Sequence, residues 1–211
     1  MLVSFKQSIL AEGQHAIGYR DDGVTPVNEY GYLSFPPLAA GGHGTSNGLA
    51  KILNSLAVAY QNKEGSDIIS HETAILMLDN GVDKGAFEFM GSLIGYGVFI
   101  VQAGDNRFLL HQAANDGFRG IALICFDGPV ASEGPVGFVI LCNGDNKGTQ
   151  LLAEVSKFIL KNDVVGLKDG VDWSRVENKK FEAEEVTQEE IVNKGFKELV
   201  LDAFLPKTSE G

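Results

Sequence analysis

The feature that most constrains the fold is a series of short apolar runs in the middle of the chain, rich in β-branched, aliphatic and aromatic residues. The runs are residues 97–101, 108–110, 121–126 and 136–142. Turn residues at 103–106 and 127–135 separate them as hairpin signals, so we expect three or four antiparallel neighbouring strands. The last two runs are apolar on both faces, which predicts helices covering both faces of the sheet.

Three segments have the helical periodicity that such a sheet requires. The first covers about 47–60 after a cap at Thr45 or Ser46, and a shorter one follows Ser70 and ends at Asn80-Gly81. The third covers about 149–161. Its expected buried stripe consists of Leu151, Leu152, Val155, Phe158 and Ile159. The sequence therefore predicts an α/β (α+β) fold with a mainly antiparallel sheet flanked by helices.

The C-terminal part of the chain has a different character. Residues 162–186 are more polar, and we interpret them as a linker. Thr187-Gln-Glu-Glu190 is a capping box, and the apolar positions after it predict an amphipathic C-terminal helix within residues 187–211.

Composition and charge narrow the classes of partner. The 211 residues carry a net charge of −11 with a pI of about 4.8, which argues against binding nucleic acid or an anionic membrane surface. No apolar run is long enough to span a bilayer and no secretory signal is seen, so we expect a soluble, cytoplasmic protein. The two cysteines, Cys125 and Cys142, are expected to be buried free thiols, as in a reducing compartment.

His111 is the main candidate for a functional residue, because it follows an apolar run and begins the polar segment 111–119. A strand that ends in a histidine and continues into a polar loop is one way for a scaffold to present a reactive surface. The alternative is a strand-end histidine paired to a backbone carbonyl. Asn115 and Arg119 are expected to shape the loop, with binding of an acidic substrate group as the second interpretation.

The other three histidines give no sign of a metal site. His15 and His71 lack a second histidine or cysteine at ligand spacing, and His43 follows Gly41-Gly42 in an expected solvated loop, so we expect neither a metal nor a cofactor.

Four segments together resemble the C-terminal part of the serine β-lactamase and penicillin-binding-protein superfamily, in particular class C β-lactamases and the carboxypeptidases and esterases related to them. The similarity covers roughly residues 10–160 and depends on the order and spacing of the segments. They are His15-Ala-Ile-Gly-Tyr19, Phe35-Pro-Pro-Leu-Ala-Ala-Gly-Gly42, the segment from His111 to Arg119, and Val139-Ile-Leu-Cys-Asn-Gly144.

The resemblance implies that residues 1–161 form the C-terminal part of a β-lactamase-like (DD-peptidase) domain. It also implies hydrolysis of esters or amides through an acyl-enzyme, with His111 as a hydrogen-bonding wall of the site beside the attacked carbonyl. The residues that would line the site are His111, Gln112, Ala113, Asn115 and Arg119.

The sequence also departs from the family pattern. No Ser-x-x-Lys occurs, so nucleophile and base are absent and no catalytic residue can be assigned. The third motif reads His111-Gln-Ala113 instead of His-x-Gly, which adds a methyl group where the family has glycine. The only Tyr-x-Asn, Tyr60-Gln-Asn62, lies at a predicted helix end and is not expected to be catalytic.

Two functions therefore stay open. In the first, the chain is the C-terminal part of a β-lactamase-related serine hydrolase, inactive alone and completed by another chain or a longer parent. In the second, it is a non-catalytic relative that serves as a binding or scaffolding module. A small ester, amide or peptide-like compound is the expected ligand. An unpaired edge at 136–142 predicts a homo-oligomer or a complementing chain.

Overall fold

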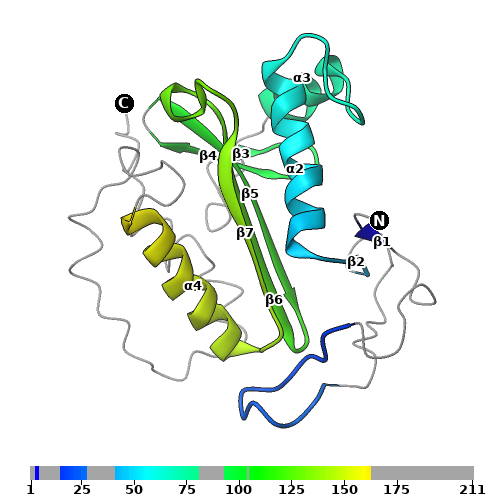
Figure 1. Ribbon diagram of the computed structural model, residues 1–211, viewed down its shortest axis with the longest axis vertical. Coiled ribbons are helices and arrows are strands. Elements are labelled where there is room, and N and C mark those ends of the chain that lie inside the picture. Colours follow the sequence, from blue (N-terminus) through cyan, green and yellow to red (C-terminus); the bar gives the residue numbers. More distant parts are fainter. Residues whose placement is uncertain (1–2, 5–14, 28–40, 81–92, 104, 163–211) are drawn as a thin grey trace.

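The computed structural model describes residues 3–4, 15–27, 41–80, 93–103 and 105–162 (Figure 1). At its centre lies a five-stranded antiparallel sheet in which each strand pairs with the next one along the chain. The strands are β3 (Leu93–Ile94), β4 (Phe99–Ala103), β5 (Asn106–Asn115), β6 (Phe118–Asp127) and β7 (Val136–Cys142). The expected antiparallel connections are confirmed, with one more strand, β3, than the sequence indicated.

Three helices pack against this sheet. They are α2 (Ser46–Gln61), α3 (His71–Asp79) and α4 (Asn146–Lys161). The side chain of Thr45 accepts a hydrogen bond from the Gly48 amide and caps α2, and Ser70 caps α3 in the same way. Helices α2 and α3 lie on one face of the sheet and α4 on the other (Figure 1). The predicted cover on both faces is therefore confirmed.

The strands are buried from both sides, because alternate residues enter two separate apolar clusters. Leu110, Leu123 and Phe138 belong to the cluster under α4, whereas Leu109 and Ile124 belong to the cluster under α2 and α3. A small two-stranded sheet, β1 (Val3–Ser4) with β2 (His43–Gly44), precedes α2.

The buried stripe predicted for α4 is wrong in part. Leu151 and Phe158 are 53% and 62% exposed, whereas the residues buried against the sheet are Leu152, Ala153 and Ser156. Small residues at 153 and 156 allow the helix axis to approach the strands, and this sets the face that packs. Apolar periodicity alone could not distinguish the two sides.

Both cysteines are free thiols, as expected: Cys125 is buried in β6 and Cys142 is half-buried at the end of β7. No helix among the described residues is long and apolar enough to span a bilayer. The predicted amphipathic helix within 187–211, and the linker at 162–186 beyond Asn162, lie outside the described residues.

Candidate functional site

His111 does not end a strand, and the polar segment after it is not a loop, which corrects both expectations. Residues 111–115 continue β5, and their pairing with β6 runs on to Asn115 opposite Phe118. The turn is only Asp116-Gly117, with Gly117 at a φ of 73°. Asp-Gly is a strong signal for a tight hairpin, and the apolar strand β6 supplies hydrogen-bond partners that outweigh the polarity of residues 111–115.

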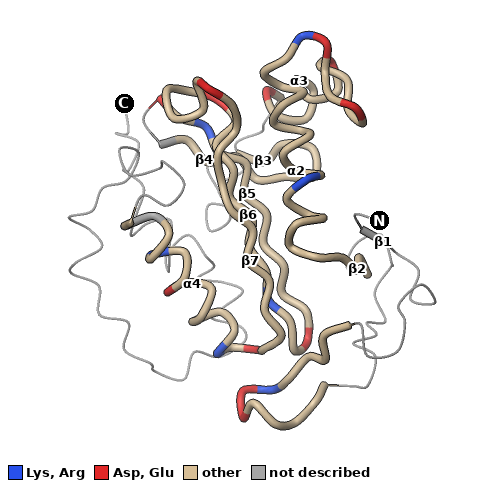
Figure 2. Tube along the Cα trace, in the orientation of Figure 1, with Lys and Arg blue, Asp and Glu red and all other residues tan. Residues whose placement is uncertain are grey.

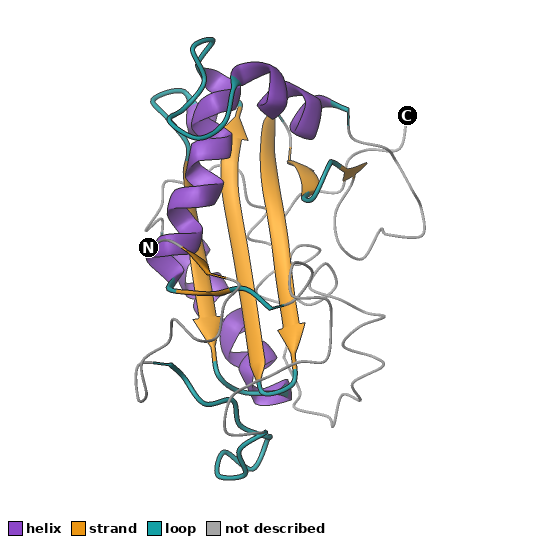
Figure 3. Cartoon of the chain, turned by 90° about the vertical axis from the view of Figure 1, so that its right-hand side faces the viewer, coloured by secondary structure: helices purple, strands orange, loops and turns teal. Residues whose placement is uncertain are grey.

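Residues 111–114, which follow Leu110, have a strand neighbour on one side only within the described part of the chain. Strand β4 reaches no farther along β5 than the pair Phe99–Leu110, whereas β6 pairs with β5 up to Asn115. We call residues 111–114 the free edge of β5. Helix α2 lies over β6 and β7, and β3 and β4 lie beside the other end of β5 (Figure 3).

The predicted site residues on this strand point to opposite faces. Because Leu109 packs under α2, alternation places His111 and Ala113 on the α2 face and Gln112 on the α4 face. The side chains of His111 and Ala113 are exposed, and Gln112 is half-buried. The expected set is thus divided between two surfaces.

The residues of β6 beside this edge are small but buried. Ala122 lies opposite His111 on β6, and Gly120 lies opposite Ala113. Ala122 belongs to the cluster under α2, and a Cβ added to Gly120 would lie 2.9 Å from Leu141 Cδ2 and 3.5 Å from Ala113 Cβ. On the α2 face, the groups open to a ligand are therefore the side chains of His111 and Ala113 on β5.

Partial desolvation lowers the pKa of His111 below its ordinary value, so the imidazole is neutral at pH 7. Within the described residues, no hydroxyl or thiol forms a hydrogen bond with this ring. A neutral imidazole can donate from one nitrogen and accept at the other. The described part of the site can bind through His111, but it lacks a nucleophile activated by it.

Arg119 is buried on the opposite face and holds the hairpin together. Its Nη1 donates to the carbonyl oxygens of Asn115 and Phe118, the latter at 2.8 Å, and lies 3.4 Å from Asp145 Oδ1. These contacts hold the ends of the two strands at the hairpin turn and leave Arg119 turned away from His111. A ligand on the α2 face could not reach it.

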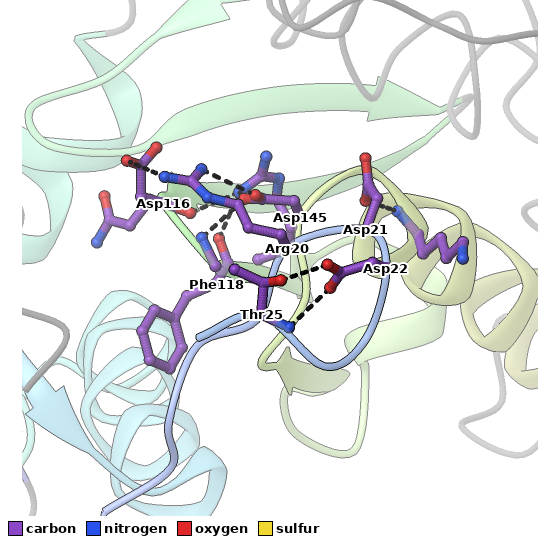
Figure 4. A network of polar contacts seen from close by, with 11 residues as sticks. Arg20, Asp21, Asp22, Thr25, Asp116, Phe118 and Asp145 are labelled. Atoms are coloured by element: carbon purple, nitrogen blue, oxygen red, sulfur yellow. Dashed lines mark hydrogen bonds and ion pairs between the residues drawn. The ribbon is translucent and has the colours of Figure 1, made fainter. Parts of the chain in front are cut away.

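Asp145 joins three segments of the chain just before α4. Its Oδ1 accepts from the Gly117 amide at 2.7 Å, and its Oδ2 accepts from Arg20 Nη1 at 3.1 Å (Figure 4). Arg20 also donates to Asp116 at 3.3 Å. Sequence reasoning missed Asp145 and Arg20. The one available signal was an acidic residue directly before a helix that follows a strand.

The loop at 20–25 completes this network. Asp22 accepts from the amides of Val24 and Thr25 and from the Thr25 hydroxyl, and these bonds lower its pKa to about 2. Asp21 accepts from the Lys147 amide at 2.9 Å, in the first turn of α4 (Figure 4). We interpret the network as a structural clamp at this end of the sheet.

Three of the four segments that carry the family resemblance meet at this clamp. Gly18 packs so closely against Phe118 that a Cβ would lie 2.6 Å from its ring, and Tyr19 forms a parallel bridge with Gly144. These three segments, which are far apart in the sequence, are therefore in contact in the structure.

Tyr60 lies at the other end of β5, in a second clamp. Its hydroxyl accepts from Arg107 at 2.8 Å and donates to Asp79 at 2.9 Å, while Arg107 stacks over Phe126. Burial raises the pKa of Tyr60. Tyr60-Gln-Asn62 is thus separated from His111 along the sheet and has a packing role.

Across the described residues, no group of three or more His, Cys, Asp or Glu side chains could hold a metal ion. No family model matches the sequence, and comparisons with curated proteins and with solved structures gave no match.

Proposed function

We propose that this chain is a non-catalytic binding module that takes an extended, peptide-like ligand along the free edge of β5. The observation that carries the proposal is the mismatch between strands: β5 continues for five residues beyond its pairing with β4. Backbone groups on that side can pair with an added strand, which is a common mode of peptide recognition.

Two side chains on the α2 face of this edge are available to a ligand. His111 and Ala113 are exposed there, whereas Gly120 and Ala122 on β6 are buried. The neutral imidazole of His111 can donate to a ligand carbonyl or accept from a ligand amide. Main-chain pairing would give affinity, and the hydrogen bond to His111 would add to it.

The experiment is a titration of the ¹⁵N-labelled chain with N-acetyl-tetraalanine amide, followed by NMR. We expect amide shifts concentrated at 111–114 and saturable binding that His111→Ala weakens about tenfold, the loss of one hydrogen bond in a site of this kind. Gln112→Ala is the matched control, because it lies on the same strand but faces α4. Shifts elsewhere, or equal effects of the two substitutions, would contradict the proposal.

The second candidate is a half-site of a β-lactamase-related serine hydrolase. It is favoured by an accessible, neutral imidazole at a strand edge, and it needs a nucleophile from outside the described residues. We expect no ester or amide turnover above background and no labelling by a fluorophosphonate probe. Stoichiometric labelling abolished by one Ser→Ala substitution would favour the hydrolase over the binding module.

A further inference from the structure

Strand β7 is the last strand of the sheet, and its outer side has no partner among the described strands. It contains no charged residue and no proline, and its pairing with β6 is continuous, without a bulge. Figure 2 shows its trace free of Lys, Arg, Asp and Glu. Charged residues, prolines and bulges usually prevent sheet edges from pairing with one another. Their absence from β7 marks it as a strand that can pair with another.

A depression of about 290 Å³ lies beside this edge on the α2 face. Ala50, Lys51 and Asn54 of α2 form one wall, and Gly137 and Val139 of β7 lie on the other side. Gly137 has to be glycine, because a Cβ there would collide with the backbone of β6 at Leu123 and Ile124. Strand β7 therefore lies close against β6 at this point, and Gly137 lines the depression with backbone atoms alone.

Leu141 projects from the same strand as an apolar side chain that is 43% exposed. It is two residues from Val139, and Gly137 is two residues from Val139 in the other direction. Alternation places all three on the α2 face, where Val139 packs. The exposed Leu141 and the depression beside Gly137 therefore lie at equal distances along the strand from Val139.

We propose that β7 pairs antiparallel with β7 of a second copy of this chain, about a two-fold axis at Val139. In this register Leu141 of each copy lies opposite Gly137 of the other, and directly opposite residues share a face. Each Leu141 then fills the depression of its partner, so the contact is self-complementary and forms twice. The two sheets become one continuous sheet.

The net negative charge of the chain should make the affinity of this dimer depend on salt concentration. Each chain has a net charge of −11, so two copies repel each other at long range, whereas the paired strands carry no charge. Lys51 lies in the wall of the depression and would be close to residue 141 of the partner. Dimerisation should strengthen as salt screens the repulsion. It does not use the free edge of β5, since β5 and β7 lie on opposite sides of β6.

The test is light scattering and sedimentation of the full chain in 150 mM salt. We expect a dimer of twice 22.6 kDa. Leu141→Lys should raise the dissociation constant about a hundredfold, tenfold for each of two leucines, because it removes the apolar contact and places lysine beside Lys51. Adding Lys51→Glu should restore most of the affinity by supplying an opposite charge.

Leu151→Lys on α4 is the matched control, since Leu151 is 53% exposed and lies outside β7. It should leave the dimer intact, with circular dichroism confirming that all variants fold. A monomeric parent chain would overturn the proposal and indicate that the edge is covered from within the chain. So would a dimer that survives Leu141→Lys or dissociates on Leu151→Lys.

Discussion

The guanidinium of Arg119 and the carboxylate of Asp145, both buried, lie 3.4 Å apart at the base of the β5–β6 hairpin. Asp145 also binds the Gly117 amide and Arg20. One carboxylate thus fixes the turn of the hairpin that presents the free edge of β5, and it does so from the far face of the sheet.

We expect Asp145→Asn to lower the free energy of unfolding by about 3 kcal/mol, because it leaves the buried guanidinium of Arg119 without its counter-charge. Urea unfolding monitored by circular dichroism gives the value. Asp116→Asn is the control: its side chain is 46% exposed, so solvent screens its ion pair with Arg20 and the loss of stability should be much smaller. Equal losses in the two variants would contradict a central role for Asp145.

His111→Ala should change the free energy of unfolding by less than about 0.5 kcal/mol, because the side chain is exposed and no described residue hydrogen-bonds to its ring. Leu123→Ala, at a fully buried position, should cost about 2–5 kcal/mol, and Phe138→Ala should also fall in that range. Thermal and urea melts compare the three. A loss at His111 as large as at Leu123 would show that the histidine belongs to the core.

Thiol reactivity should separate the two cysteines. Burial raises the pKa of Cys125 to about 11 and raises that of the half-buried Cys142, so at pH 8 both should react slowly with a disulfide reagent, Cys125 more slowly. An unfolded thiol ionises near pH 9, so stability from Cys125 is present below that pH and is lost as the pH rises toward 11. Faster labelling of Cys125 than Cys142 in the folded chain would contradict the burial.

The sequence predicted the sheet and its helices well where local signals and packing agreed. Ser70 was predicted as a cap, Thr45 was one of two candidates with Ser46, and the hairpin residues at 103–106 gave the β4–β5 connection. It failed where tertiary contacts decide the outcome. The Asp116-Gly117 turn was a usable signal, but the polarity of residues 111–115 concealed a strand whose stability comes from pairing with β6.

The candidate site could be predicted only in part. Residues 111–119 were recognised as important, but a list in sequence order could not show that Arg119 faces α4 while His111 faces α2. Asp145 and Arg20 are 125 residues apart, and nothing local connects them. The free edge of β5 follows from the different lengths of β4 and β6, which periodicity does not determine.

Amide hydrogen exchange along β5 tests the central claim most directly, because it reads the free edge residue by residue. In the free chain we expect slow exchange for all amides at 107–110, which lie between β4 and β6, and fast exchange for alternate amides at 111–114. Saturating N-acetyl-tetraalanine amide should slow those alternate amides and leave β7 unchanged. Uniform protection of 111–114 in the free chain, or no change with the peptide, would contradict the account.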